Sequence, residues 1–172
     1  MNSSEPTEAA ITIRLVAPGD AEGIREIYNR EVIGSTITFD MVERTLPEQL
    51  EWIADHSGSY PALVAVDAAG TVLGFASLSA YRPRPAYATT VENSVYVHQD
   101  ARRTGLGSRL MAELIALAIA HGFHSMIARI VGDHDASIAM HAALGFKPIG
   151  REHEVGRKFG TWLDVVLMQR ML

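Results

Sequence analysis

The sequence predicts a single α/β domain built on a mixed, mostly antiparallel central sheet with helices on both of its faces. The chain has 172 residues, 48% of them hydrophobic, which suits one domain with a real core. Two apolar runs, 62–66 and 72–78, flank the turn sequence 67–70, as is typical of an antiparallel hairpin. Later strand-like runs alternate with helical patterns, which favours crossover connections. We expect a flexible tail at 1–9 and the domain at 10–172.

The first third of the chain is predicted to hold one strand and two helices. Apolar and polar residues alternate over 11–16, which indicates a strand. A Pro-Gly-Asp sequence then stops it, and the helix that follows carries Ile24 and Ile27 on one face. Residues 31–44 look irregular, and the sequence Thr-Leu-Pro at 45–47 begins a second, shorter helix.

The rest of the chain contains apolar runs separated by glycine, proline and aspartate, which act as turn and stop signals. The expected elements are a loop at 81–87, strands at 90–97, 125–131, 146–151 and 161–170, a long helix from Leu106 to about His121 closed by Gly122, and a helix capped by Asp133 or Asp135 that ends at Gly145.

Composition excludes several classes of protein. The net charge is −5 and the basic residues are scattered, whereas a nucleic-acid-binding protein usually has a basic face. The absence of cysteine excludes disulfides, thiolate catalysis and cysteine metal sites. No apolar stretch has the length of a membrane span, and no secretory signal pattern opens the chain, so we expect a cytoplasmic protein. Asp133, His134 and Asp135 have the side chains of a metal site, but a helix cap explains them, and no metal is expected.

The most informative stretch is a basic, glycine-bearing run between the strand at 90–97 and the long helix. It consists of Arg102, Arg103, Thr104, Gly105, Leu106, Gly107 and Ser108. Glycine lets a ligand approach the backbone, the first amides of a helix are free donors, and arginine stays charged. The run lacks the Lys-Ser/Thr pair of the phosphate-binding loop and the third glycine of the dinucleotide fingerprint. It therefore predicts a diphosphate ligand such as coenzyme A or a nucleotide.

The pattern Arg-x-x-Gly-x-Gly over 102–107 resembles the coenzyme A loop of the GNAT family of N-acetyltransferases. The helix ending Leu-Gly-Phe at 144–146 is similar to the one that flanks the pantetheine arm in that family. Other shared features resemble the phosphinothricin and methionine sulfoximine or sulfone acetyltransferases. They are Ile27-Tyr28-Asn29, Tyr81-Arg82-Pro83, the strand 91–97, Met140-His141 and the segment 158–164. The resemblance implies a GNAT fold whose central strands splay apart, acetyl-CoA as co-substrate, a small-molecule amine as acceptor, and a homodimer.

Two side chains are the candidate catalytic residues. Glu92 begins the strand leading to the loop among apolar neighbours that can raise a carboxyl pKa, as a general base requires. Similar enzymes place their catalytic glutamate here, acting directly or through water; the alternative is a strand-end glutamate in solvent. His141 stands where many relatives have the tyrosine that protonates the leaving thiolate. It is interpreted as that acid, as a sulfur contact or as a packed helix residue.

The remaining coenzyme contacts follow from the resemblance. Backbone amides around Val95, Tyr96 and Val97 are expected to bind the pantetheine arm and to polarise the thioester carbonyl. Ser137 and His134 are expected beside the pantetheine, although His134 stands where the subfamily usually has asparagine.

The acceptor pocket is also assigned through the resemblance. The residues on its implied walls are Tyr28, Asn29, Phe39, Arg82 and Tyr87, with Lys158, Phe159 and Trp162 near a partner subunit's active site. Arg82 either forks onto a substrate carboxylate or is an ordinary surface arginine. Three functions stay open: acetylation of an amino-acid analogue, acetylation of a protein N-terminus or lysine, and non-catalytic binding of acyl-CoA. The presence of both Glu92 and His141 favours a catalyst.

Overall fold

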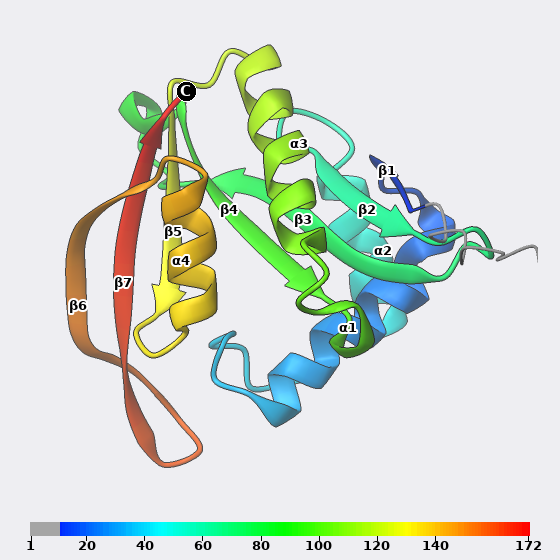
Figure 1. Ribbon diagram of the computed structural model, residues 1–172, viewed down its shortest axis with the longest axis horizontal. Helices are drawn as coiled ribbons and strands as arrows, with labels where there is room; N and C mark the ends of the chain where they lie inside the picture. The colour runs from blue at the N-terminus through cyan, green and yellow to red at the C-terminus, as the bar shows by residue number, and fades with distance from the viewer. Residues whose placement is uncertain (1–10) are drawn as a thin grey trace, which may run out of the picture.

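The computed structural model describes residues 11–172, and the tail expected at 1–9 lies outside them (Figure 1). A seven-stranded sheet has the order β1-β2-β3-β4-β5-β7-β6. Its strands are β1 (Thr12–Leu15), β2 (Ala62–Val66), β3 (Val72–Ala80), β4 (Thr90–Val97), β5 (Ser125–Val131), β6 (Lys147–Lys158) and β7 (Thr161–Met171). Neighbouring strands are antiparallel except β4 and β5, which are parallel. The mixed, mostly antiparallel sheet predicted from the sequence is thus confirmed.

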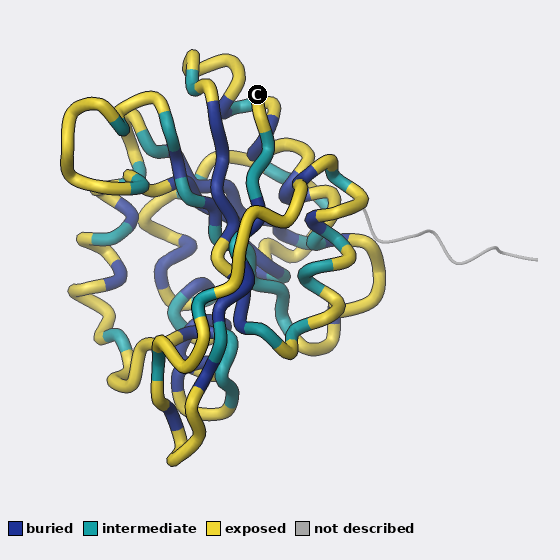
Figure 2. The backbone as a smooth tube through the Cα atoms, turned by 90° about the vertical axis from the view of Figure 1, so that its left-hand side faces the viewer, coloured by how far each residue is buried: buried dark blue, intermediate teal, exposed yellow. Residues whose placement is uncertain are grey.

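Within the described residues, four α-helices cover the two faces of this sheet (Figure 1). They are α1 (Ala21–Gly34), α2 (Leu46–Asp55), α3 (Leu106–Ala120) and α4 (Asp135–Ala143). The alternation of side chains along a strand divides the core. Leu63 and Ala65 of β2 join the cluster under α3, while Val64 and Val66 join the cluster under α1. Figure 2 shows the buried positions gathered along the strands, with exposed segments around them. Within residues 11–172, none of the helices has both the length and the apolar character that crossing a membrane requires.

Two elements extend further than the sequence predicted. Helix α1 continues to Gly34, because Glu31 and Val32 are buried on the face that already carries Ile24 and Ile27. Strand β6 was expected to end at 151 but runs to Lys158. Its second half is mostly exposed and polar, and its register with β7 shifts between Glu152 and Gly156, so no alternating pattern marks it.

The short segment between the last two strands is the tip of a hairpin. Phe159 and Gly160 join β6 to β7 with φ angles of 49° and 79°. Two consecutive left-handed residues are what a tight turn needs to match the twist of the strands. Lys158 therefore ends β6, and Trp162 lies within β7, in agreement with the strand expected at 161–170.

The central strands splay apart, as the resemblance implied. Strand β4 pairs with β5 only from Thr90 to Asn93. Beyond that point β4 continues through 94–97, while β5 follows β7 through Arg129–Val131. The backbone groups of 94–97 on that side have no strand partner in β5, so they are open to a ligand.

Candidate active site

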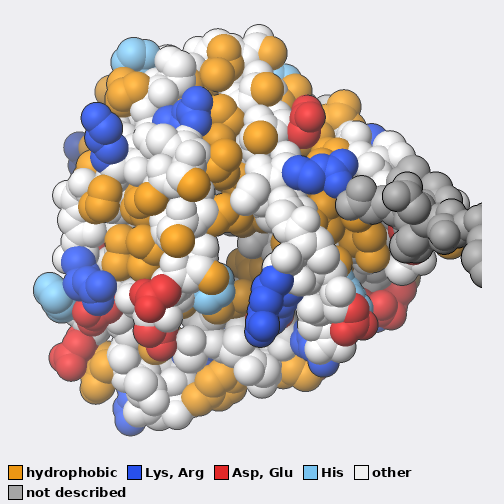
Figure 3. Space-filling view, in the orientation of Figure 1, with side chains coloured by type: hydrophobic (Ala, Val, Ile, Leu, Met, Phe, Trp, Pro, Cys, Tyr) orange, Lys and Arg blue, Asp and Glu red, His pale blue; other side chains and the backbone are white. Residues whose placement is uncertain are grey.

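Two adjoining cavities lie beside the open end of β4, and the smaller one lies in the gap between β4 and β5. They share the wall residues Ile37, Val95, Tyr96, His134 and Ser137. The larger has a volume of about 370 Å³ and extends between the basic loop and α4. The smaller, about 70 Å³, lies between the diverging strands and reaches His141. In Figure 3 the molecule is hollowed at this place, with a histidine on one side and a basic side chain on the other. A long ligand can therefore lie in the larger cavity with one end inside the sheet.

Six of the seven residues predicted to bind the diphosphate line the larger cavity. They are Arg102, Arg103, Gly105, Leu106, Gly107 and Ser108. Gly105 is the N-cap of α3 with a φ of 81°, and Arg103 also has a positive φ, 63°. Left-handed residues in a turn before a helix direct successive N–H groups into one concavity, which attracts anions. Thr104 does not line the cavity; its hydroxyl donates to the Ala101 carbonyl at 2.7 Å.

The loop also fits closely against α4. A Cβ atom on Gly107 would lie 3.2 Å from the Met140 sulfur and 3.6 Å from a methyl group of Val97. Glycine thus keeps the floor of the larger cavity open at the start of α3. Free helix amides, a basic rim and this narrow floor suit the diphosphate of coenzyme A.

Arg102 is joined to α1 rather than left open to a ligand. Its guanidinium forms an ion pair with the buried carboxylate of Glu31 and donates to the Val97 carbonyl at 3.3 Å. Glu31 also lines the larger cavity. The sequence identified Arg102 but not Glu31, although Glu31 continues the spacing of Ile24 and Ile27 on the inner face of α1.

Glu92 is half-buried on β4, opposite Ser79 of β3 and Ile127 of β5. Burial raises the pKa of its carboxyl group, the nearby Arg129 opposes that rise, and Glu152 adds to it. Arg129 and Glu152 are themselves paired at 2.7 Å. Glu92 is not among the residues that line the smaller cavity, but Ser94, the next residue on its face of the strand, is.

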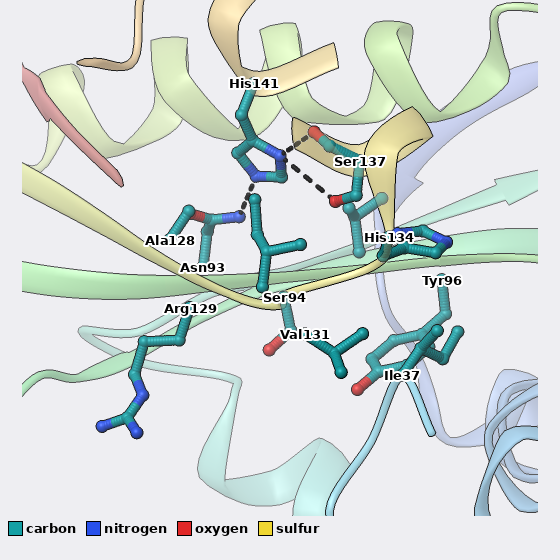
Figure 4. Close-up of a pocket in the computed structure, with 12 residues that line it drawn as sticks. Ile37, Asn93, Ser94, Tyr96, Ala128, Arg129, Val131, His134, Ser137 and His141 are labelled. Carbon is teal, nitrogen blue, oxygen red and sulfur yellow. Dashed lines mark hydrogen bonds between the residues drawn. The ribbon is translucent and has the colours of Figure 1, made fainter. Parts of the chain in front are cut away.

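Glu92 and His141 lie on opposite faces of β4. Alternation directs Glu92, Ser94 and Tyr96 toward α1 and α2, and Asn93 and Val95 toward α3 and α4. Figure 4 shows His141 and Asn93 on one side of the strands and Arg129 and Tyr96 on the other. A reacting group held in the gap would therefore have Glu92 on one side and His141 on the other.

His141 is almost fully enclosed, with 2% of its surface exposed. Its Nδ1 lies 2.8 Å from the Ser137 carbonyl oxygen, and its Nε2 lies 2.9 Å from Nδ2 of Asn93. Burial lowers the pKa of the ring, and the hydrogen bond to Ser137 opposes this shift. Asn93 was not identified from the sequence, although it is a polar residue at an inward position of an apolar strand.

His134 and Ser137 stand where the two cavities meet. His134 is the N-cap residue of α4, and burial together with the charge of Arg102 lowers the pKa of its ring. The N-cap residue of α4 is His134, whose side chain makes no cap hydrogen bond, so the cap expected from Asp133 or Asp135 is wrong. Within residues 11–172, no three His, Cys, Asp or Glu side chains gather as metal ligands would.

Three residues expected on the acceptor wall make hydrogen bonds within the protein. The buried Tyr28 donates its hydroxyl to the Asp40 carboxylate, and its ring stands edge-on to Tyr96 at 5.3 Å. Asn29 exchanges two hydrogen bonds of 2.8 Å with the backbone of Arg44. The Lys158 ammonium is buried, donates to the Thr38 carbonyl at 2.8 Å, and has its pKa lowered by burial.

The other acceptor-wall residues lie nearer the surface. Phe39 packs on Gly156 of β6. Arg82 is exposed, with its guanidinium 4.9 Å from the Tyr81 ring and 5.6 Å from the Tyr87 ring. Phe159 and Trp162, 61% and 57% exposed, lie at the hairpin tip. None of these residues lines the two cavities, so the structure does not bring them together with the coenzyme loop.

Known proteins resemble this chain over nearly its whole length. An L-methionine sulfoximine/L-methionine sulfone acetyltransferase from Pseudomonas paraeruginosa is 43% identical over 92% of each chain. A phosphinothricin N-acetyltransferase from Streptomyces coelicolor is 39% identical over 97% of this chain and 99% of its own. The crystal structure of a GNAT superfamily phosphinothricin acetyltransferase from Sinorhizobium meliloti, in complex with AcCoA, has a TM-score of 0.91 and 40% identity, covering 94% of this chain and 88% of its own.

Residues 13–167 match the family described as "Acetyltransferase (GNAT) domain". The splayed sheet, the glycine-bearing loop at the start of α3 and the two cavities between them agree with this match. The chain belongs to the GNAT family and is an acetyltransferase that uses acetyl-CoA.

Proposed function

We propose that the protein transfers an acetyl group to the α-amine of a small amino-acid-like substrate of the phosphinothricin, methionine sulfoximine or methionine sulfone type. The observation that carries the proposal is the opening between β4 and β5, where the coenzyme loop lies at one end and the strand face of Glu92 at the other. The names of the relatives support this class of acceptor.

Acetyl-CoA supplies the acetyl thioester. The loop amides and Arg103 hold the diphosphate, while Arg102 anchors the loop through Glu31. The open backbone of 94–97 binds the pantetheine arm as a further strand would, between β4 and the His134–Ser137 wall. N–H groups around Tyr96 and Val97 polarise the thioester carbonyl, in the manner of an oxyanion hole.

Glu92 acts as the general base, directly or through water. An amino acid enters as its ammonium form, which must lose a proton before its nitrogen can attack. The raised pKa of Glu92 brings its proton affinity closer to the working pH, which improves a carboxylate as a base. Its position on the face of β4 opposite His141 supports a role on the acceptor side of the gap.

Arg82 binds the carboxylate of the acceptor. Its flat guanidinium lies beside the rings of Tyr81 and Tyr87, which contact each other edge to face, and its N–H edge is available for a bidentate contact. Tyr28, Phe39 and Tyr87 enclose the compact side chain of the acceptor.

Turnover of acetyl-CoA with a panel of amines tests the acceptor class. The panel contains phosphinothricin, methionine sulfone, a decarboxylated analogue, a polyamine and a short peptide. The two amino-acid analogues should be the best acceptors. Hydrogen bonds to a charged group are worth about 1.5–3 kcal/mol, so Arg82→Ala should raise their KM about 10- to 100-fold, and that of the decarboxylated amine far less. Preference for the peptide or polyamine would overturn the acceptor class, while equal losses would remove Arg82 from binding.

Residues 10–172 work as one cytoplasmic acetyltransferase domain that forms a homodimer. The exposed Phe159 and Trp162 side chains at the hairpin tip support a protein contact there, since exposed aromatic residues are enriched at interfaces. In a dimer this tip and the buried Lys158 beside it would lie near the partner's pocket. Sedimentation at micromolar concentration tests the dimer, and a fully active monomer would contradict the shared pocket.

A further inference from the structure

A buried polar pair connects the splayed strand to α4. Asn93 is the last residue of β4 that pairs with β5, and it is 7% exposed. His141, 2% exposed, faces it from α4. Both residues line the smaller cavity (Figure 4). The pair therefore lies where the acetyl group must be held if the proposed function is correct.

The surroundings of His141 define which ring nitrogen carries the proton. The Ser137 oxygen, 2.8 Å from Nδ1, belongs to a carbonyl and can only accept, so Nδ1 carries hydrogen. In a neutral ring Nε2 is then bare, and it accepts a hydrogen bond from the Asn93 amide at 2.9 Å. Both nitrogens of the neutral ring are satisfied.

In the described part of the chain, residues 11–172, the neighbours of His141 offer no charge that would favour a second proton on its ring. Phe146 stands edge-on at 5.0 Å, and the Met111 sulfur lies 3.5 Å from the same Asn93 nitrogen. Among residues 11–172 the ionisable group that acts on the ring is His134, which disfavours a positive charge.

The Asn93 carbonyl oxygen is buried and has no hydrogen-bond partner within residues 11–172. A half-turn of the amide would bring this oxygen to Nε2, and only a doubly protonated ring could donate to it. A buried acceptor without a partner is costly, so its presence marks a constraint at this position.

We propose that Asn93 is a positioning residue which, with the Ser137 carbonyl, fixes His141 as the neutral ring protonated on Nδ1. The proposal rests on the proposed function for its place in the reaction. It means that His141 orients the wall of the gap and holds no proton on Nε2 to give to the departing sulfur. The transfer still balances: the ammonium first gives one proton to solvent through Glu92, the nitrogen–carbon bond forms, the carbon–sulfur bond breaks, and the second proton lost by nitrogen reaches the thiolate through Glu92 and solvent.

Nitrogen-15 NMR of histidine-labelled, coenzyme-free protein tests the proposal without turnover. The His141 resonances should show a protonated Nδ1 and a bare Nε2 from pH 8 to pH 6. In Asn93→Asp a carboxylate faces Nε2, which should raise the pKa of His141 by about 1–3 units. Ser137→Ala is the matched control, because it removes the hydroxyl 3.4 Å from Nδ1 but keeps the carbonyl, and should leave the tautomer unchanged.

Two results would overturn the proposal. One is a proton on Nε2 of the wild-type ring at pH 7, and the other is an unchanged His141 pKa in Asn93→Asp. Asn93→Leu controls for a general packing effect, because leucine has a similar size but offers no polar atom. It should leave Nε2 without its hydrogen-bond donor while the Ser137 carbonyl still holds the Nδ1 proton, and it should not raise the pKa of His141. Failure of the amine panel would instead refute the proposed function and leave these NMR results standing.

Discussion

Gly156→Ala should displace Phe39 and thereby separate a packing role from an acceptor-binding role. A Cβ atom on Gly156 would come within 2.8 Å of Cζ of the Phe39 ring and overlap the ring edge. Phe39 is 41% exposed, so about three-fifths of its surface, roughly 120 Å², is buried. At about 25 cal/mol per Å², complete ejection of the ring would cost about 3 kcal/mol, and a partial shift about 1–2 kcal/mol.

Gly150→Ala is the matched control on the same strand. Its Cβ atom would meet only the Leu167 methyl at 3.9 Å, an ordinary contact. Alanine is favoured over glycine within a strand by about 0.5–1 kcal/mol, so this variant should be neutral or slightly stabilised. Urea unfolding should therefore place the two variants about 2 kcal/mol apart, which is about 4–8 °C in Tm.

A double variant completes the test. Once Phe39→Ala removes the ring, Gly156→Ala should have no further destabilising effect, because the overlap is gone. If Phe39 also encloses the acceptor, Gly156→Ala should raise the KM for the acceptor and leave that for acetyl-CoA unchanged. Equal stability of Gly156→Ala and Gly150→Ala would refute the reasoning.

Three further perturbations follow from the site. Gly105→Ala and Gly122→Ala both place alanine at a φ near 80° in open space, and each should lose about 1–2 kcal/mol of stability. Calorimetry should show coenzyme A binding weakened about 10-fold or more in Gly105→Ala but unchanged in Gly122→Ala, because a lost hydrogen bond to a charged phosphate costs about 1.5–3 kcal/mol. Equal affinity of the two variants for coenzyme A would show that the loop does not bind it. Glu152→Gln removes a charge that raises the pKa of Glu92, so the acidic limb of kcat/KM against pH should move to lower pH, whereas the exposed Glu154→Gln on the same strand should leave it in place. Burial lowers the pKa of His141, and those of His134 and His56, below the unfolded value of about 6.5. The stability that these neutral rings contribute is therefore fully present above pH 6.5 and is lost as the pH falls toward the folded pKa. A free energy of unfolding in urea that stays flat from pH 7.5 to pH 5.5 would contradict these shifts.

Local pattern was sufficient for most of the fold. The hairpin at 67–70, the long helix closed by Gly122 and the sheet class follow from turn residues and apolar periodicity, and the structure agrees with them. The second half of β6 was missed because exposed polar residues and a register shift remove the alternation that identifies a strand. Helix α1 runs to Gly34, further than expected, because Gly34 and the threonines after it made 31–44 look irregular.

The opening of the sheet could not be predicted from pattern. Residues 94–97 continue the alternation of 90–93, yet only the latter pair with β5, and this choice depends on where β5 turns toward β7. The resemblance to a known family supplied that expectation. In the same way, the composition of the basic loop indicated a diphosphate ligand, but nothing local indicated that Arg102 would be paired with a buried carboxylate from α1.

Partners distant in sequence account for the remaining differences at the site. Asn93 and His141 are 48 residues apart, and Lys158 reaches the Thr38 carbonyl across 120 residues. Hydrogen bonds of this kind depend on tertiary packing rather than on spacing along the chain. Lys158 and Asn29 both donate hydrogen bonds to backbone carbonyl groups of the protein. Separate variants of the two residues are needed to distinguish this structural role from a role in acceptor binding.

Single-turnover acetylation of an amino-acid analogue by Glu92→Gln, compared with the wild-type protein, tests the central claim most directly. Glutamine keeps the size of the side chain but cannot accept the amine proton. The account predicts unchanged binding of acetyl-CoA and a rate lowered by roughly 10²- to 10⁴-fold, as is typical when a general base is removed. A wild-type rate in Glu92→Gln from pH 6 to pH 9 would contradict it, and so would an absence of acetyl transfer to any amino-acid analogue by the wild-type protein.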